Sequence, residues 1–398
     1  MSISRRKFLG QSALTAVGGM LIPSFLKGFD GRNTLLNNSS NKLVIIQFSG
    51  GNDGLNTIVP YQNDIYYQQR PNIAIKKSDV IKVTDELGFH PALKSLQGLY
   101  DNGDMSIINN VGYPNPDRSH FRSMDIWHTA SNSNEYLSTG WLGRYLDKHN
   151  NNNHQALEMD DTLSLALKGI EHSGFAMSDP KRLQRTVKTP IVKALVKHHH
   201  DHDHEENVAY LYQTLANTVS SSDYLFEKAK TYSSSQSYPK NKLGKSLKQV
   251  AELIISGCDT QVYYVTLGGF DTHANQTMTQ ERLLKAYAES VSAFIKDLKQ
   301  HNQWNDTMVM TFSEFGRRVK ENGSRGTDHG TAGNLFLMSG KLKKAGFYND
   351  APDLTTLDKG DLIYNMDFRR VYATLLDKWL KVDDQAILNR QFKALSIV

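Results

Sequence analysis

Cysteine is nearly absent from this sequence, in which Cys258 is the single example among 398 residues. One thiol cannot form an intramolecular disulfide, so a disulfide-stabilised scaffold is excluded. Cys258 lies inside the run Ile254–Val265, whose apolar residues predict that the thiol is buried.

An excess of charge of one sign is also missing, because 46 basic residues face 41 acidic ones and leave a formal net charge of +5. Lys193–Lys197 is too short a basic segment to indicate nucleic-acid binding, and no lysine and arginine block with interleaved aromatic residues is present. No Gly-x-Gly-x-x-Gly loop follows a predicted strand, which argues against a dinucleotide-dependent oxidoreductase. We therefore expect no nucleic-acid partner.

Long hydrophobic runs are absent as well. No segment of the mature chain approaches the ~20 apolar residues that span a bilayer, so no stable membrane span is expected. The N-terminal stretch Gln11–Leu26 is also too short, and Gly18, Gly19 and Pro23 interrupt it.

The N-terminus does contain a twin-arginine signature, Ser4–Leu9, in which Arg5 and Arg6 precede Lys-Phe-Leu. We interpret residues 1–40 as a signal peptide and linker, with cleavage expected within Lys27–Asn41. The alternative is a basic tail before an amphipathic helix. The signature predicts a periplasmic or otherwise exported protein, with the twin-arginine translocation machinery as a partner.

The remaining residues, 41–398, alternate predicted strands and helices as a parallel sheet requires. The predicted strands are Leu43–Phe48, Met105–Val111, Gln261–Leu267, Met308–Phe312 and Asn334–Ser339. The predicted helices include His90–Asn102, Ser119–Ala130, Leu243–Ser256, Met278–Asn302 and Phe368–Trp379. The pattern predicts an α/β fold with a mainly parallel central sheet flanked by helices, and a mainly helical insertion at about 150–240.

Four polar segments place carboxylates and imidazoles where strands are predicted to end. They are Ser49–Gly54, Gly269–His273, Thr311–Arg317 and Gly326–Gly330. Loops at the carboxyl edge of an open α/β sheet are where such folds build metal and substrate sites. The clustering therefore predicts a metal-dependent hydrolase.

Six motifs in order resemble those of the DUF1501 family of bacterial proteins, which usually carry twin-arginine signals. They are Gly50–Gly54, Asp117–Phe121, Gly140–Arg144, Gly269–His273, Ser313–Arg317 and Gly326–Gly330. The family is in turn remotely similar to the alkaline phosphatase and sulfatase superfamily. That similarity implies a central sheet with helices on both faces, usually two divalent metals, and a Ser/Thr or formylglycine nucleophile.

The superfamily resemblance implies a role for several residues. Asp53 matches the first metal aspartate, which follows the first strand. Ser119 matches the position of the nucleophile at a helix N-terminus. Asp271 and His273 correspond to the aspartate–histidine pair of the metal site.

One motif departs from the superfamily pattern. Its Asp-His-Gly is replaced here by Glu314-Phe315-Gly316, which keeps a carboxylate and lacks an imidazole. His329 corresponds to the last histidine, and Asp328 is available as a substitute ligand. The departure removes one expected ligand of the second metal.

The candidate ligands mix carboxylates with imidazoles, which favours one or two zinc or manganese ions over calcium. The six are Asp53, Asp271, His273, Glu314, Asp328 and His329. Arg317, together with Arg318 and Arg122, has the fork geometry that binds an anionic ester. Ser119 and Arg317 are thus the candidate catalytic residues, and a small anionic ester is the expected substrate.

Structural interpretations remain open for these residues taken one by one. Asp53 is equally suited to an Asx turn after a strand. Glu314 is suited to an ion pair with Arg317 or Arg318, and Ser119 to a helix cap. The tract His198–His204 is interpreted as a solvated loop with incidental metal affinity, outside the catalytic site.

Two function classes follow from these observations. The first is an exported metal-dependent hydrolase of phosphate or sulfate esters. The alternative is a non-catalytic binding or envelope-assembly protein that keeps the alkaline-phosphatase-like fold, as the Phe315 departure would allow.

Overall fold

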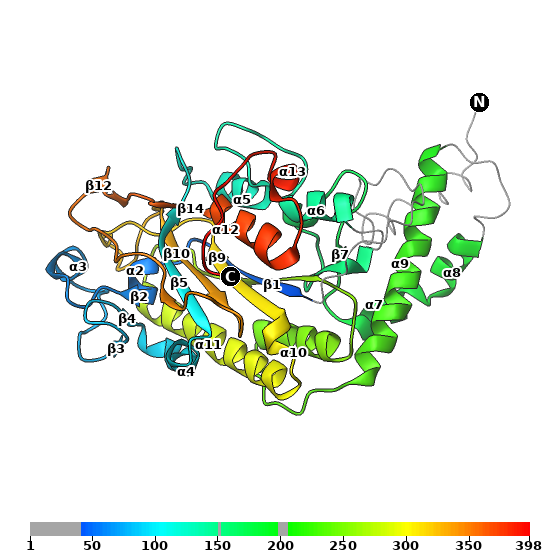
Figure 1. Cartoon of the computed structure of the whole chain (residues 1–398), viewed down its shortest axis with the longest axis horizontal. Helices are drawn as coiled ribbons and strands as arrows, with labels where there is room; N and C mark the ends of the chain where they lie inside the picture. The colour runs from blue at the N-terminus through cyan, green and yellow to red at the C-terminus, as the bar shows by residue number, and fades with distance from the viewer. Residues whose placement is uncertain (1–40, 150–152, 198–205) are drawn as a thin grey trace.

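The computed structural model describes residues 41–149, 153–197 and 206–398. The predicted signal peptide and linker at residues 1–40 and the His198–His204 tract lie outside the described residues. A nine-stranded sheet has the order β11-β5-β10-β9-β1-β8-β6-β7, with β14 beside β5 (Figure 1). Its strands are β1 (Lys42–Ser49), β5 (Met105–Gly112), β6 (Ala156–Glu158), β7 (Phe175–Ala176), β8 (Val262–Gly268), β9 (Thr307–Ser313), β10 (Gly333–Met338), β11 (Gly346–Phe347) and β14 (Met366–Asp367).

The sheet is mainly parallel, as the sequence predicted. β1 lies between β8 and β9 and is parallel to both. β10 is the exception, since it is antiparallel to β5 and to β9. The carboxyl ends of β1, β5, β8 and β9 therefore meet at one edge, together with the beginning of β10. The predicted α/β fold class is confirmed.

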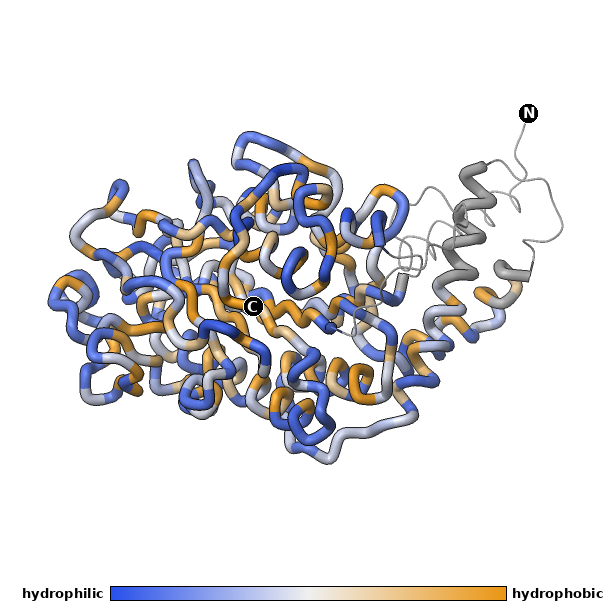
Figure 2. The backbone as a smooth tube through the Cα atoms, in the orientation of Figure 1, coloured by the Kyte–Doolittle hydropathy of each residue, from blue (hydrophilic) through white to orange (hydrophobic). Residues whose placement is uncertain are grey.

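Side chains of β1 alternate between two hydrophobic cores, one on each face of the sheet. Val44, Ile46 and Phe48 pack on one face and Leu43 and Ile45 on the other, and all five are buried. Hydrophobic residues follow the central strands and the inner sides of the helices (Figure 2). A buried sheet of this kind reads as a continuous apolar run in the sequence.

Helices cover both faces of the sheet (Figure 1). The first face is covered by η1 (Pro91–Leu96), α4 (Gln97–Asp101), α10 (Lys242–Ile255) and α11 (Gln276–Gln300). The second face is covered by α5 (His120–Thr129), α6 (Trp141–His149), α12 (Phe368–Thr374), η6 (Leu375–Leu380) and α13 (Asp384–Leu388). The segment predicted as one helix over His90–Asn102 is instead a 3-10 helix followed by a short α-helix, with Pro91 at the first position.

Two smaller substructures flank the carboxyl edge of the sheet. One contains α2 (Gly54–Thr57), α3 (Asp64–Gln69) and the three-stranded sheet of β2 (Ile58–Val59), β4 (Gly88–Phe89) and β3 (Ile81–Lys82). The other is the hairpin of β12 (Leu357–Asp358) and β13 (Asp361–Leu362). Both contribute apolar residues to a third hydrophobic cluster.

The region between α6 and α10 contains both helices and sheet strands. Its elements are η2 (Asn153–Gln155), β6, η3 (Leu165–Leu167), β7, α7 (Pro180–Val187), α8 (Pro190–Lys197) and α9 (Glu206–Thr231). β6 pairs with β8, so this region extends the main sheet at one side. No helix within the described ranges combines the length and the apolar character needed to cross a membrane.

The segment after α9 is fastened to the first face by one buried carboxylate. Asp297 on α11 accepts hydrogen bonds from the hydroxyls of Tyr232 (3.0 Å), Ser234 (2.5 Å) and Tyr238 (2.9 Å). Asp297 is fully buried, so the three donors replace the water that its charge would otherwise need. This contact, the Asp297 clasp, joins the connection between α9 and α10 to α11.

Candidate metal centre

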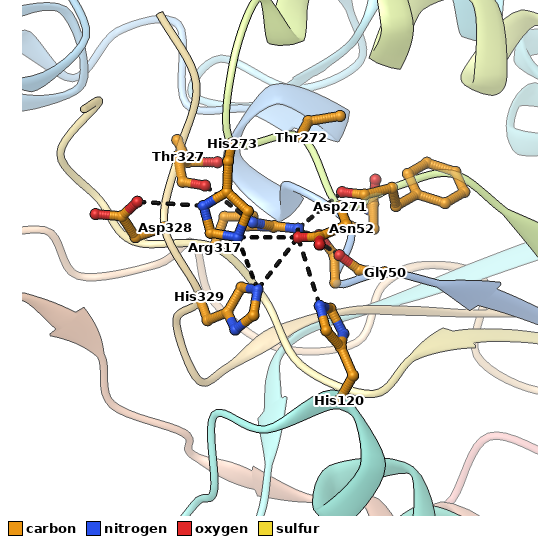
Figure 3. A network of polar contacts seen from close by, with 12 residues as sticks. Gly50, Asn52, His120, Asp271, Thr272, His273, Arg317, Thr327, Asp328 and His329 are labelled. Carbon is orange, nitrogen blue, oxygen red and sulfur yellow. Dashed lines mark hydrogen bonds and ion pairs between the residues drawn. The ribbon is translucent and has the colours of Figure 1, made fainter. Parts of the chain in front are cut away.

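The polar segments predicted at the strand ends come together at the carboxyl edge of the sheet (Figure 3). Gly50 follows β1 with φ +119°, and a Cβ there would lie 2.4 Å from the backbone nitrogen of Asp271 after β8. Only glycine permits this close approach. The loop after β9 and the segment before β10 join in an isolated bridge between Arg317 and His329.

Three imidazoles surround one carboxylate oxygen at this edge. Asp271 Oδ1 lies 3.4 Å from His120 Nε2, 3.0 Å from His273 Nε2 and 3.1 Å from His329 Nε2. The ligand atoms of His120, Asp271 and His329 all lie within 4.8 Å of one another. The Asp271 side chain is 48% exposed, so the cluster is open to solvent. His120, Asp271, His273 and His329 are called the His/Asp centre below.

Each imidazole of the His/Asp centre is oriented through its other nitrogen. His120 Nδ1 lies 2.8 Å from Glu314 Oε1, and His273 Nδ1 lies 3.3 Å from Asp328 Oδ1. His329 Nδ1–H donates to the backbone carbonyl of Arg118 at 2.7 Å. An acceptor at Nδ1 favours the proton on that nitrogen. The Nε2 atoms contact Asp271 Oδ1, and those of His273 and His329 also lie 2.9 Å from each other. A metal ion bound here would take the place of these Nε2 contacts.

Glu314 lies behind His120 and is fully buried. Its carboxylate also accepts hydrogen bonds from the backbone N–H of Gly50 (2.8 Å) and the hydroxyl of Ser313 (3.1 Å). The structure therefore places Glu314, a predicted metal ligand, behind His120, where its carboxylate orients the imidazole.

The electrostatics of the centre keep Asp271 ionised. Burial raises its pKa, but hydrogen bonds from Arg317 and His329 outweigh burial and lower the pKa to about 2. The pKa of His120 is raised, chiefly by its hydrogen bond to Glu314 and against the effect of burial. The centre thus combines a stable anion, Asp271, with one imidazole, His120, whose pKa is raised.

Arg317 lies beneath Asp271 with its side chain fully buried. Its guanidinium donates to Asp271 Oδ1 at 2.7 Å and to the backbone carbonyls of Gly50, Gly51, Phe270 and Thr327. These carbonyls belong to three different loops, so Arg317 holds the loops together. Its Nε, Nη1 and Nη2 thus donate to protein acceptors, and the contact with Oδ1 holds Asp271 in position.

Asp53 has a different environment from the one that the superfamily resemblance implied. It caps α2, where its side chain accepts from the Asn56 N–H at 3.3 Å, and it forms a buried ion pair with Arg70 at 2.7 Å. Gln276 donates to the same carboxylate. Asp53 makes no ion pair or hydrogen bond with the His/Asp centre among the described residues. The Asx-turn alternative describes its geometry.

Ser119 occupies the N-cap position of α5, is exposed, and makes no side-chain cap hydrogen bond. The next residue, His120, is the functional candidate that the sequence analysis missed. The motif Asp117–Phe121 contains this histidine directly after Ser119, the predicted nucleophile.

Phe315, at the position where the superfamily motif has an imidazole, packs against two imidazoles of the centre. Its ring centroid lies 4.8 Å from that of His120 and 4.9 Å from that of His329. The ring therefore supports two of the three imidazoles from one side. His120, at the start of α5, lies beside Phe315 in the structure.

The fold and the sequence were compared with those of known proteins. Similar solved structures include the lipoteichoic acid synthase LtaP from Listeria monocytogenes, with 8% identity over 84% of this chain and 73% of that chain and a TM-score of 0.37. The C-terminal periplasmic domain of EcEptC from Escherichia coli has 12% identity, coverage of 77% and 74%, and a TM-score of 0.36. An alkaline phosphatase superfamily protein from Vibrio parahaemolyticus has 11% identity, coverage of 98% and 78%, and a TM-score of 0.43.

No curated protein matches the sequence. A family model does match: the one described as "Protein of unknown function (DUF1501)" covers residues 40–390. The family prediction made from the six motifs is confirmed, and this chain belongs to the DUF1501 family.

Proposed function

We propose that this protein is an exported, metal-dependent hydrolase of phosphate or sulfate esters, with a divalent ion held by the His/Asp centre. The observation that carries the proposal is the convergence of three Nε2 atoms on Asp271 Oδ1, with every Nδ1 held by an acceptor. Ligating histidines in proteins are almost always fixed through their second nitrogen in this way.

The distances and donor types fit a transition-metal ion. Ligand atoms about 2.1 Å from a tetrahedral ion are about 3.4 Å apart, close to the 3.0–3.4 Å between Asp271 Oδ1 and the imidazoles. Three imidazoles and one carboxylate favour Zn²⁺ or Mn²⁺, because Ca²⁺ prefers oxygen ligands throughout. The ligand atoms of His120, Asp271 and His329 form one group, and His273 contacts it through Asp271 and His329, so we propose one ion per chain.

The chain's own residues supply the remaining parts of the reaction. Such an ion, when bound, stabilises negative charge on the oxygens of the ester. Ser119 lies at the start of α5 beside His120, and we assign it the role of nucleophile toward phosphorus or sulfur. The free N–H groups of the first turn of α5 favour an anionic group at this position. Arg317 keeps Asp271 in place.

Export by the twin-arginine pathway is part of the proposal and is supported by Ser4–Leu9. That pathway carries folded proteins, which suits a centre assembled from loops that meet only in the folded chain.

The decisive experiment measures metal content and ester turnover in the same preparations. We expect dialysed protein to retain about one Zn²⁺ or Mn²⁺ and to hydrolyse aryl phosphates or aryl sulfates. His120→Ala and His329→Ala should each lower metal affinity by more than about 100-fold, since loss of a ligand exceeds loss of a supporting residue. His301→Ala, at the end of α11, is the matched control and should leave metal content unchanged.

The possible outcomes separate the two function classes. Folded protein that binds no metal, or variants that stay fully loaded, would reject the proposed centre. Stoichiometric metal without turnover across the ester panel would favour the non-catalytic alternative.

A further inference from the structure

Two arginines beside the His/Asp centre share one buried carboxylate. Arg118 contacts Asp361 Oδ2, and Arg318 Nε donates to Asp361 Oδ1 at 3.2 Å. Asp361 is 1% exposed, whereas the side chains of Arg118 and Arg318 are 42% and 35% exposed. Two guanidiniums thus face one buried carboxylate, and the charge of Arg318 also interacts with the carboxylate of Asp328. The exposed Asp358 and Lys359 on the same hairpin cancel each other.

The two guanidiniums have donors to spare. Arg318 Nη2 donates to the backbone carbonyl of Lys359 at 2.6 Å, which fixes its orientation. Within the described part of the chain, Arg118 Nε, Arg118 Nη1 and Arg318 Nη1 have no hydrogen-bond partner. Guanidinium donors held in a fixed plane match the oxygens of a phosphate, sulfate or carboxylate.

The arginine pair is joined directly to the segments that carry the centre. The carbonyl oxygen of Arg118 accepts the Nδ1–H of His329 at 2.7 Å, and Arg118 precedes Ser119 and His120 in the chain. The backbone N–H of Arg318 donates to the carbonyl of Asp328 at 3.1 Å. Figure 3 shows His120 and His329 on the same side of Asp271. The backbone segments that carry the arginine pair are therefore held against the segments that carry His120 and His329.

We propose that Arg118 and Arg318, held by Asp361, form a subsite for a second anionic group of the substrate. The inference rests on the proposed function and narrows its substrate class to esters that carry a further phosphate, sulfate or carboxylate beyond the bond that is cleaved. A polyanionic chain is one such substrate. The arginines act here through binding, because the reacting atoms lie at the His/Asp centre.

The test compares binding of one and of two anionic groups by isothermal titration calorimetry. The probes are methylphosphonate and propane-1,3-diphosphonate, titrated into wild type, Arg118→Gln, Arg318→Gln and Lys320→Gln, each with and without added Zn²⁺. Lys320→Gln removes an exposed charge two residues from Arg318 and is the matched control. Arg118→Lys and Arg318→Lys keep the pairing with Asp361 if the glutamine variants fold poorly.

We expect the Zn²⁺-loaded wild type and Lys320→Gln to bind the diphosphonate at least about tenfold more tightly than the monophosphonate. The ratio should fall toward one in both glutamine variants, and partly in the lysine variants. The same ratio in all proteins, or no preference in the wild type, would overturn the subsite. If Zn²⁺ does not bind but anion binding still depends on Arg118 and Arg318, the subsite stands and the proposed function fails.

Discussion

At the scale of single residues, the buried carboxylate of Glu314 supports His120 from behind, with Oε1 at 2.8 Å from Nδ1. Glu314→Gln keeps an acceptor for the Gly50 N–H but removes the negative charge. We expect metal affinity to fall by about 10- to 100-fold, as for other residues that orient a ligand. Competition with a chelator measures this. The exposed Glu281→Gln is the control, and equal affinity in both variants would contradict the assigned role.

Substitution of Ser119 is expected to affect the activity of the protein but not its stability. Because its hydroxyl makes no cap hydrogen bond, Ser119→Ala should change the free energy of unfolding by less than about 0.5 kcal/mol. Turnover of aryl phosphates or sulfates should be lost, with metal content unchanged. Activity retained in Ser119→Ala, measured beside a melting curve, would remove the serine from the reaction.

Glu158 at the end of β6 gives the molecule a pH-dependent stability. Burial raises the pKa of this carboxyl to about 7, although the Ser164 N–H donates to it. The unfolded chain ionises near the ordinary value of 4.5, so between pH 4.5 and 7 the folded state binds more protons. This contribution to stability is full below pH 4.5 and is lost as pH rises to 7, by about 3 kcal/mol in total.

Urea unfolding of wild type and Glu158→Gln at pH 5 and pH 8 tests this. The difference in unfolding free energy between wild type and Glu158→Gln should change by about 3 kcal/mol between pH 5 and pH 8. Burial lowers the pKa of His128 to about 4, so its contribution to stability rises with pH. This contribution is the same in both proteins and cancels when their unfolding free energies are subtracted. A pH-independent difference would show that Glu158 is not protonated in the folded protein.

At the scale of elements, the Asp297 clasp determines how the connection after α9 meets α11. Asp297→Ala leaves the buried hydroxyl of Ser234 and the partly buried hydroxyls of Tyr232 and Tyr238 without this acceptor, and we expect unfolding to require on the order of 3 kcal/mol less free energy. Tyr238→Phe removes one donor and should cost about 1 kcal/mol. Asp306→Ala, which breaks an exposed pair with Lys341, should cost less than about 1 kcal/mol. Equal losses in Asp297→Ala and Asp306→Ala would contradict the clasp.

The central strands could be predicted because each is a buried apolar run, and Leu43–Phe48 became β1 with one added residue at either end. The antiparallel direction of β10 could not be predicted, because the six residues of this strand do not indicate whether it runs parallel or antiparallel to its neighbours. The two short strands β6 and β7 were not predicted, because two or three residues are too few to show a hydrophobic periodicity. Their pairing with β8 is a tertiary effect.

The candidate site was predicted in part for the same reason. Asp271, His273 and His329 follow or precede long strands, so the sheet itself brings them together. The buried ion pair of Asp53 with Arg70 could not be predicted, because the two side chains meet only in the folded chain. Arg317 looked like an anion binder, but the carbonyls that surround it come from loops whose proximity no local pattern records.

At the scale of the whole molecule, the His/Asp centre exists only when distant segments have come together, so the proposed ion would bind the folded chain. A pathway that exports folded proteins fits this order of events. The double variant Arg5→Lys, Arg6→Lys should therefore remain in the cytoplasm, since recognition depends on the paired guanidiniums. Cell fractionation checks the prediction, with Lys7→Arg as the control that keeps both arginines. Normal export of the double variant would contradict it.

The position of β1 has a consequence for synthesis on the ribosome. This strand is made early, yet its two neighbours, β8 and β9, both come from the second half of the chain. Until residue 268 has left the exit tunnel, the sequence Leu-Val-Ile-Ile-Gln-Phe has unpaired edges on both sides, and one edge stays unpaired until residue 313 has emerged. Such a segment is prone to aggregate with copies of itself. The nascent chain should therefore depend on a chaperone that covers Leu43–Phe48 during translation.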